Sequence, residues 1–543
     1  MSLHKLTAGD GYEYLTRQVA AMDSTEKGAS ALADYYSAKG ESPGRWMGTG
    51  LAALANEDPA SVVAVGEEVG ADQMKALFGE GRHPNADQIE RTVAEAAMGR
   101  GLERDAATRQ GLAHSMLGQP FPVYEGASAF RKAVGQAFTD YNTEHNERWN
   151  APIDPEKRAE LRTRVAQSMF VEEYGRPPLN DRELSGFVAK GSRQKTTAVA
   201  GYDLTFSPVK SVSTLWAVAP RDVSQTVEEA HQAAVEHAVR FLEDNATYTR
   251  TGHAGVAQVD TQGLMATAFT HRDARSGDPD LHTHVAVSNK VATRTPNGEL
   301  KWLALDGRVL HKMAVAASEV YNSAIEREMY ERLGCEFSER EPAERGKRTV
   351  REIDGVDTRL NEVWSSRRAA IDQRRGELAQ QFQATHGRAP TNAESLALAQ
   401  RANLETRQAK HEPRSLAEQR AEWRTTALRV LGGRDGLSSM VRRATSPRRR
   451  RRMELTDQWI EATADHVIAT VAESRSRWQP AHIIAEAQRQ IRSAGIVSDD
   501  TDTAVDAVVT AALGSTRSLL LGPSEDLGEP DQLLRSDWAR IYT

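Results

Sequence analysis

Three histidines with strand-like spacing are the strongest chemical feature of this sequence. His282 and His284 are two residues apart, so in a β-strand both imidazoles lie on one face. A loop of ten residues, rich in Gly, Asp and Pro, can fold His271 back across an antiparallel pair. Three neutral imidazoles hold a divalent cation and leave coordination positions open, as a catalytic metal requires. The alternative is a set of surface histidines beside a polar loop.

An acidic residue in another β-prone segment can orient one of these histidines. Asp203 lies in the alternating run Tyr202–Phe206, where it can accept a hydrogen bond from the outer nitrogen of a ligand histidine and fix its tautomer. It could instead be a carboxylate that caps a turn. Lys210 and Ser211 follow in the first turn of an expected helix, whose amide dipoles attract phosphate, although Lys210 could equally be an ordinary solvated lysine. Arg272, inside the histidine segment, is a further candidate DNA contact.

Two pairs of tyrosines near the start of the chain are candidate nucleophiles. Tyr12 and Tyr14 lie on the first predicted helix, and Tyr35 and Tyr36 form a second pair about twenty residues later. A phenol is a poor nucleophile at neutral pH because its pKa is about 10. A divalent cation on the non-bridging oxygens of a phosphodiester makes phosphorus more electrophilic, so that a nearby phenolate can displace the sugar oxygen in line. Each tyrosine taken alone could instead be a core or interface aromatic.

The segments around these residues predict a mixed domain with an antiparallel sheet. After the strand-like run Tyr202–Phe206, Ser207 and Pro208 are typical of the cap and first residue of a helix that continues over 209–218. The patterns that follow predict one more helix and then three β-like runs, over 223–244, 255–259, 264–271 and 282–292. A turn at Pro296-Asn297-Gly298 predicts a hairpin before a strand over 300–305. From about residue 310 the pattern is almost entirely helical.

Composition is typical of a globular protein in a reducing compartment. The length of 543 residues predicts about three domains, and 39% of the residues are hydrophobic against 27% charged. The single cysteine, Cys335, excludes an intramolecular disulfide and a multi-thiolate metal site. No apolar run approaches the ~18 residues of a membrane helix, and the start of the chain lacks the order of a signal peptide. We therefore expect a cytoplasmic protein without membrane insertion.

A basic region lies within a chain whose net charge is −7. Residues 351–460 hold 22 Lys and Arg against 14 Asp and Glu, a net charge of +8, and Arg448–Arg452 is an unbroken run of five. Such a run is either a solvated linker or an arm that contacts phosphates. The sequence has no Walker A loop, so we expect no ATP-driven motor in this chain.

Four blocks of sequence, in this order, resemble the MobF conjugative relaxases, the TrwC and TraI type, within the HUH endonucleases. They are the Tyr12/Tyr14 segment, the segments Asp34–Trp46 and Tyr202–Ser213, and the histidine segment that ends at His284. Actinobacterial members look closest. The resemblance implies an α+β fold in which a central antiparallel sheet carries the histidines between flanking helices. It also implies a metal-dependent enzyme that nicks one strand of DNA at an origin of transfer, stays covalently attached to the 5′ end, and later rejoins the strand.

The resemblance gives the tyrosines separate roles. Tyr14 is expected to attack first, because the spacing Tyr-x-x-x-Gln-Val-Ala from Tyr14 fits the actinobacterial members, and Tyr12 is its rival. Tyr35 or Tyr36 would serve the strand transfer that ends the reaction.

The resemblance also implies a metal and several partners. Asp203 would orient a histidine or accept the tyrosine proton. The cation would be Mg²⁺ or Mn²⁺ in the cell, with Zn²⁺ or Ni²⁺ possible in vitro, although imidazole ligands by themselves favour Zn, Ni or Cu. Its ligands would be His271, His282 and His284. The implied partners are single-stranded origin DNA with an adjacent hairpin, relaxosome accessory proteins, a coupling protein and a type IV secretion system, with possible transfer of the protein to the recipient cell.

The predicted domain organisation departs from the family in two places. A relaxase domain over 1–340 contains a helical insertion at about 86–195, and residues 341–543 form a helical, partly basic extension in place of the usual helicase. Three other functions stay open: a rolling-circle replication initiator of the same superfamily, a three-histidine metal-dependent DNA hydrolase without a covalent intermediate, and a DNA-binding scaffold.

Overall fold

A computed structural model of the chain describes residues 1–15, 43–55, 61–122, 128–145, 147–148, 151, 153–179, 181–192, 198–295, 297–340, 349–407, 414–446, 455–495, 501–519, 521 and 535. Tyr35, Tyr36 and the run Arg448–Arg452 lie outside these residues. Among the helices over these ranges, none combines the length and apolar character that crossing a bilayer requires.

Five antiparallel strands form the central sheet, in the order β1-β3-β7-β6-β2. They are β1 (Ser2–Thr7), β2 (Arg45–Met47), β3 (Val199–Phe206), β6 (Ala266–Asp273) and β7 (Pro279–Ser288). The register sets Thr205 of β3 opposite His284 of β7, and His271 of β6 opposite His282. Residues opposite each other in an antiparallel pair point to the same face, so the histidines share one face. The predicted α+β fold with a central antiparallel sheet is confirmed.

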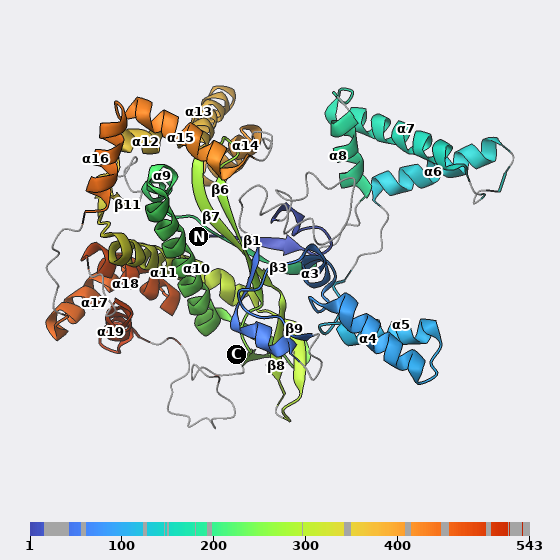
Figure 1. Cartoon of the computed structure of the whole chain (residues 1–543), viewed down its shortest axis with the longest axis horizontal. Helices are drawn as coiled ribbons and strands as arrows, with labels where there is room; N and C mark the ends of the chain where they lie inside the picture. Colours follow the sequence, from blue (N-terminus) through green and yellow to red (C-terminus); the bar gives the residue numbers. More distant parts are fainter. Residues whose placement is uncertain are drawn as a thin grey trace.

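Three helices cover the other face of this sheet (Figure 1). They are α9 (Lys210–Val218), α10 (Arg221–Ala246) and α11 (Gly307–Leu333). Buried apolar residues recur along α10 at helical spacing, among them Val227, Ala230, Ala234, Val235, Ala238 and Leu242. This stripe packs against Leu204, Leu281 and Val285 of the sheet in the largest core, so burial of apolar surface fixes α10 against the strands.

A second core lies near β1 and β2. It brings together Leu6 of β1, Trp46 of β2, Phe269 of β6 and Tyr12. Short helical segments close it, namely η1 (Thr49–Leu54), α3 (Ala71–Met74) and η3 (Lys75–Glu80). Phe269 and His271 are two residues apart in β6, so this core borders the histidine face.

Three two-stranded antiparallel sheets flank these cores. They are β4 (Tyr248–Thr251) with β5 (Ala257–Asp260), β8 (Lys290–Arg294) with β9 (Leu300–Ala304), and β10 (Phe337–Arg340) with β11 (Val350–Ile353). The predicted hairpin around Asn297-Gly298 joins β8 to β9, and Gly298 supplies the left-handed backbone with a φ of 81°. The β10–β11 pair lies in a region for which the sequence predicted helix. Phe337 and Ile353 are opposite each other in this pair and both pack in the main core, which favours strands here.

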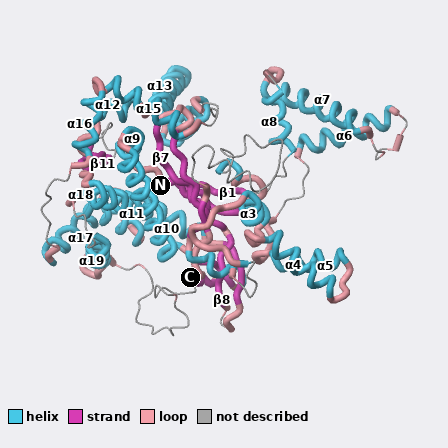
Figure 2. The backbone as a smooth tube through the Cα atoms, viewed as in Figure 1, coloured by secondary structure: helices cyan, strands magenta, loops and turns pink. Residues whose placement is uncertain are grey.

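The helices of the predicted insertion form two groups that extend away from the sheet on the side opposite α10 and α11 (Figures 1 and 2). One group is α4 (Ala86–Gly99) with α5 (Arg104–Ser115). The other is α6 (Ala129–Glu144), α7 (Pro155–Tyr174) and α8 (Asp181–Ser192), which share a small core that includes Phe130, Phe170 and Phe187.

The C-terminal region is mainly helical, as predicted. Its helices are α12 (Thr358–Val363), α13 (Ser366–His386), α14 (Asn392–Glu405), α15 (Leu416–Val430), α16 (Arg434–Ala444), α17 (Asp457–Ala472), α18 (Pro480–Ser493) and α19 (Thr501–Leu513). Trp364, Trp423 and Met440 join the main core, so the first part of this region packs with the sheet and its helices. The last three helices have their own apolar core.

The structure corrects three local predictions. Helix α9 begins at Lys210 rather than Pro208, because Val209 still has an extended backbone with ψ of 156°. The loop between His271 and His282, predicted to have ten residues, spans only 274–278, because β6 and β7 continue pairing as far as Asp273 and Pro279. The single strand predicted over 282–292 is two strands, since the chain leaves the sheet after Ser288 to form the β8–β9 hairpin.

Candidate active site

The three predicted metal ligands lie together on one face of β6 and β7. Their ring centres form a nearly equilateral triangle, with sides of 5.3 Å between His271 and His282, 5.2 Å between His271 and His284, and 5.3 Å between His282 and His284. Three imidazoles that each bind one cation through a nitrogen at about 2.1 Å place their ring centres about 5 Å apart. Over the described ranges, no group of three His, Cys, Asp or Glu side chains has its donor atoms placed to hold a metal ion as the side chains stand. The positions of the three rings are therefore the evidence for a cation site.

Hydrogen bonds orient two of these imidazoles in the same way. His284 Nδ1 lies 2.9 Å from Asp203 Oδ2, and His282 Nδ1 lies 2.7 Å from the carbonyl oxygen of Asp280. Both partners are acceptors, so each Nδ1 carries the proton and donates, and each Nε2 keeps a lone pair for a cation. Asp203 is 1% exposed, which keeps water from competing for the bond to His284. The structure therefore places Asp203 within hydrogen-bond distance of His284, and its orienting role stays a prediction.

Tyr14 reaches the same carboxylate. Its hydroxyl donates a hydrogen bond to Asp203 Oδ2, and its ring meets the His284 ring edge-on with 6.1 Å between centroids. Tyr14 is nevertheless 42% exposed, so a large substrate can approach the phenol from the solvent. Burial of the hydroxyl end, the charge of Asp203 and the hydrogen bond to it all raise the pKa of Tyr14 above its ordinary value. The phenol is thus protonated at rest and already has an acceptor for its proton.

Sequence comparison places the chain in a family. A model described as TrwC relaxase matches residues 8–430, most of the chain and all of the described site residues. The chain belongs to the TrwC relaxase family. The resemblance to MobF-type relaxases predicted from the motifs is confirmed.

Two relatives share part of this TrwC-family chain. The multifunctional conjugation protein TraI of Escherichia coli is 36% identical over 181 residues, which cover 33% of this chain and 10% of TraI. The protein of the same name from strain K12 is 34% identical over 185 residues, with the same two shares. The chain thus spans about a tenth of the length of these curated relatives.

Two solved structures of a conjugative relaxase, TrwC, are also similar. A metal-free complex of TrwC with OriT DNA shares 26% identity and a TM-score of 0.34, over 48% of this chain and 88% of TrwC. A metal-bound complex with OriT DNA shares 23% identity and a TM-score of 0.35, over 55% and 96% of the two chains.

The other predicted tyrosines are placed differently from Tyr14. Tyr12 is 8% exposed and packs against Phe78 in the second core, with 6.5 Å between ring centroids. Burial, together with the carboxylates of Glu13 and Glu80, raises its pKa to about 12. Tyr12 is therefore a packed core side chain, whereas Tyr14 faces the histidines. Tyr35 and Tyr36 lie outside the described residues, so their roles stay predictions.

The phosphate-binding role predicted for the first turn of α9 is corrected by its contacts. Lys210 Nζ donates to the carbonyl oxygen of Pro279 at 2.6 Å, and burial lowers the pKa of this lysine. Ser211 is fully buried, and its backbone N–H donates to Glu352 Oε2 at 2.9 Å. A carboxylate of the chain itself thus occupies the helix N-terminus that the sequence analysis offered to phosphate. Arg272 points to the α10 side of the sheet, opposite the histidines.

A buried polar chain behind the histidines escaped the sequence analysis. His231 of α10 contacts Tyr321 Oη through Nδ1 and Thr283 Oγ1 through Nε2, both at 2.8 Å. Thr283 Oγ1 lies 2.9 Å from Thr270 Oγ1, which accepts from Gln232 Nε2 at 2.7 Å. Because Thr283 stands between His282 and His284, this chain fixes the strand under both. A lone histidine in a helical run carried no sequence signal for this role.

Proposed function

We propose that this TrwC-family chain is a conjugative relaxase, which nicks one strand of origin-of-transfer DNA and keeps the 5′ end as a phosphotyrosyl ester. The observation that carries the proposal is that Tyr14 and His284 share the carboxylate of Asp203 beside the other two histidines. A nucleophile next to a cation site is what transfer of a phosphodiester to a hydroxyl requires. The names of the relatives, a conjugation protein and a conjugative relaxase in complex with OriT DNA, supply the substrate that we carry over.

In the proposed step the phosphate exchanges its ester bond to the sugar 3′ oxygen for an ester bond to tyrosine. Tyr14 Oη attacks phosphorus as the bond from phosphorus to the 3′ oxygen breaks, which leaves a 5′-phosphotyrosine and a 3′ hydroxyl. Asp203 accepts the tyrosine proton, and the departing oxygen takes a proton from water. Because the pKa of Tyr14 is raised, its proton leaves during the attack rather than before it. The ester bond is conserved, so a 3′ hydroxyl can reverse the step and rejoin the strand.

The donor set fits a divalent cation. Its ligands would be His271, His282 and His284, and a cation held there would neutralise charge on the phosphate. Asp203 keeps the Nε2 lone pair of His284 turned outward and raises its basicity. We infer Mg²⁺ or Mn²⁺ in the cell, with phosphate oxygens and water completing the coordination, and Zn²⁺ or Ni²⁺ as possible substitutes in vitro.

The remaining roles extend the same proposal. We divide the chain into a relaxase domain over 1–340, with the helical insertion at about 86–195, and a helical extension over 341–543. Tyr35 or Tyr36 would perform the final strand transfer. Relaxosome accessory proteins, a coupling protein and a type IV secretion system would be the partners of a reaction that begins in the cytoplasm.

The direct test is capture of the covalent product. Purified protein is incubated with fluorescent single-stranded oligonucleotides tiled across the origin region, with Mg²⁺ or Mn²⁺, and run on a denaturing protein gel. We expect a labelled protein band that is lost in Tyr14→Phe and in the double variant His282→Ala/His284→Ala. The matched control is Tyr12→Phe, which removes a hydroxyl from the neighbouring core tyrosine and should keep the band.

The other outcomes identify the rival functions. DNA that is cut without a labelled protein band would point to a metal-dependent hydrolase and contradict the proposal. A band that forms at a replication origin, but not at the transfer origin, would identify a rolling-circle initiator. Binding without cleavage, unaffected by removal of metal, would indicate a scaffold protein.

A further inference from the structure

A large cleft lies on the face of the sheet that is opposite the histidines. Its volume is about 1290 Å³, and α10, β6, β2, α11 and α15 all contribute to its walls. Ala268, Thr270 and Arg272 line it from β6, and these residues alternate with Phe269 and His271, which face the other way. Pockets for small ligands measure about 300–1,000 Å³, so this cleft has room for part of a polymer.

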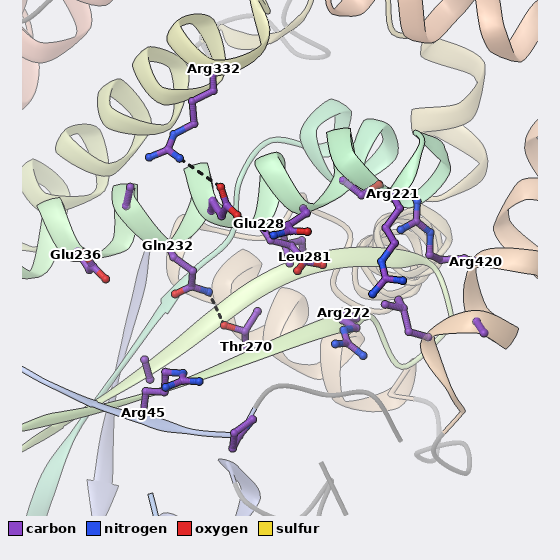
Figure 3. A pocket seen from close by; sticks show the side chains of 18 residues that line it. Arg45, Arg221, Glu228, Gln232, Glu236, Thr270, Arg272, Leu281, Arg332 and Arg420 are labelled. Carbon is purple, nitrogen blue, oxygen red and sulfur yellow. Dashed lines mark hydrogen bonds and ion pairs between the residues drawn. The ribbon is translucent and has the colours of Figure 1, made fainter. Parts of the chain in front are cut away.

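The cleft has charged ends of different character (Figure 3). At one end Arg332 lies 3.5 Å from Glu229 and also bonds Glu328, so its charge is balanced within the protein. At the other end Arg221 of α10, Arg272 of β6 and Arg420 of α15 gather from three separate elements (Figure 3). This second group is here called the arginine end.

Two members of the arginine end, Arg221 and Arg420, form no ion pair with any residue in the part of the chain that the structure describes. Arg420 donates to two neutral acceptors, the carbonyl oxygen of Ala219 and the hydroxyl of Ser224 at 2.7 Å. Burial lowers the pKa of Arg420, the carboxylate of Glu228 opposes that shift, and the charges of Arg424 and Arg221 add to it. Like charges held together in a partly buried cleft favour an anion between them.

The position of Arg221 costs helix stability. It is the first residue of α10, where the helix dipole is positive and a cation is unfavourable. Arg221 is exposed and makes no hydrogen bond or ion pair with any described residue. Arg221 is therefore available to a phosphate at a helix end that attracts anions, next to Asp222, the acidic residue of the first turn.

The cleft opens along an edge of the sheet. Strand β2 pairs with β6 only at Ala266–Ala268, so over the described residues no strand covers the outer edge of Phe269–Asp273. Helix α15 packs against the Asp273 end of this edge, where Gln419 Nε2 donates to the buried carboxylate of Asp273 at 2.9 Å. The part of the edge without a strand partner, Phe269–His271, lies between the histidine face and the cleft.

We propose that this cleft is a second binding site for single-stranded DNA, in which the arginine end contacts the phosphates of a segment away from the nick. This inference rests on the proposed relaxase function and names a further site for the same strand. The charge fits a phosphodiester backbone, and the volume fits several nucleotides rather than one. A site behind the sheet keeps hold of the strand without contact with the reacting phosphate.

The test uses the full chain and two fluorescein-labelled oligonucleotides. One spans only the cleavage site, and the other adds a thymidine tail of about 12 nucleotides, within the range that single-strand binding folds cover. Fluorescence anisotropy gives Kd for each across a range of salt. We compare Arg221→Gln with Arg332→Gln, the same change at the balanced end of the same cleft, and with Arg221→Lys, which keeps the charge.

We expect Arg221→Gln to weaken binding of the tailed oligonucleotide about tenfold and to reduce the slope of log K against log salt by about 0.7, the loss of one phosphate contact. Arg332→Gln should change Kd less than twofold, and Arg221→Lys should restore most of the affinity. Arg221→Gln should melt no lower than wild type, because it removes an unfavourable charge from the start of a helix.

Several results would overturn the inference. The cleft is not a DNA site if Arg221→Gln binds both oligonucleotides as wild type does, if Arg332→Gln weakens binding as much as Arg221→Gln does, or if the thymidine tail adds no affinity. The covalent product is measured on the same oligonucleotides. If the covalent product forms but Arg221→Gln does not change binding of the tail, only the proposal of a second site in the cleft is rejected. If no oligonucleotide gives a covalent product, the proposed relaxase function is rejected.

Discussion

The hydroxyl of Tyr14 donates a hydrogen bond to the carboxylate of Asp203, which lies 189 residues further along the chain. The same carboxylate accepts from His284 Nδ1 at 2.9 Å. One acidic side chain thus joins the candidate nucleophile to a candidate metal ligand. Several properties of the protein should depend on that carboxylate.

Asp203→Asn should weaken both metal binding and catalysis. The neutral amide of the variant lacks the negative charge that orients His284 and that can accept the Tyr14 proton. Loss of such a supporting residue typically lowers metal affinity or activity about 10–100-fold. The measurement is the rate of covalent product formation as a function of Mn²⁺ concentration. Asp280→Asn is the matched control, because it removes a carboxylate 3.7 Å from His282 Nδ1 but keeps the bond from that nitrogen to the backbone carbonyl of Asp280. Equal effects of the two variants would contradict the role of Asp203.

Tyr14→Phe and Tyr12→Phe should separate chemistry from packing. Tyr14 faces the histidines and Tyr12 packs in a core, so only Tyr14→Phe should abolish the covalent product, while Tyr12→Phe should retain it within about threefold. Mass spectrometry of the trapped adduct locates the modified tyrosine. An adduct on Tyr12 would reverse the assignment.

Stability should fall at mildly acidic pH because of His231. Burial, and to a smaller extent the charge of His282, lowers the pKa of His231 to about 3, against about 6.5 in the unfolded chain. Below pH 6.5 His231 therefore takes up a proton in the unfolded state but stays neutral in the folded state. Its contribution to the free energy of unfolding is full above pH 6.5 and is lost as pH falls toward 3.

The expected size of this loss is about 2 kcal/mol between pH 7.5 and 5.0. Melting temperatures of wild type and His231→Gln at the two pH values give the measurement. The variant lacks the titrating group, so its melting temperature should fall by less than that of wild type over this range. A parallel fall in both proteins would show that other groups control the acid response.

Thr283→Val should expose the role of the buried polar chain. The change leaves His231 Nε2 and the Thr270 hydroxyl each short of a partner inside the core, which costs about 1–3 kcal/mol. The readout is the melting temperature together with the Mn²⁺ dependence of product formation. Thr283→Ser keeps the hydroxyl and is the matched control. It should stay close to wild type, and an equal loss would indicate packing rather than hydrogen bonding.

Lys210→Met should lower stability without changing DNA contacts. Lys210 Nζ bonds the carbonyl oxygen of Pro279 at the start of β7, so the variant loses a tie between α9 and the histidine strand. The salt slope of DNA binding should stay at its wild-type value, because no phosphate contact is removed. A slope smaller by about 0.7 would restore the phosphate role that the first turn of α9 was predicted to have.

Local spacing was enough to predict the sheet and the histidine cluster. In a strand the period of two residues is imposed by the backbone itself, so His282 and His284 had to share a face once their segment formed a strand. The alternating run around Asp203 and the Asn297-Gly298 turn carried the same kind of local information. The strand limits were less accurate, because pairing across the sheet extended β6 and β7 into the predicted loop.

The physical difference between Tyr14 and Tyr12 came from the tertiary structure. The spacing Tyr-x-x-x-Gln-Val-Ala favoured Tyr14 only through a resemblance, whereas the folded chain places Tyr12 against Phe78 and Tyr14 against Asp203. The partner of the Ser211 amide was also invisible in the sequence, since Glu352 lies 141 residues away. Long-range contacts of this kind depend on how distant elements pack, and the short-range periodicity of a sequence does not predict that packing.

The sequence by itself thus determined which candidate ligands, acids and nucleophiles the protein contains and which of them share a strand face. Residue types and short-range periodicity are local properties and can be obtained from the sequence. The tertiary structure decided which tyrosine faces the histidines, which basic residues already serve the fold, and where arginines from β6, α10 and α15 meet behind the sheet. Those choices follow from the burial of apolar surface, which brings together side chains that the chain keeps hundreds of residues apart.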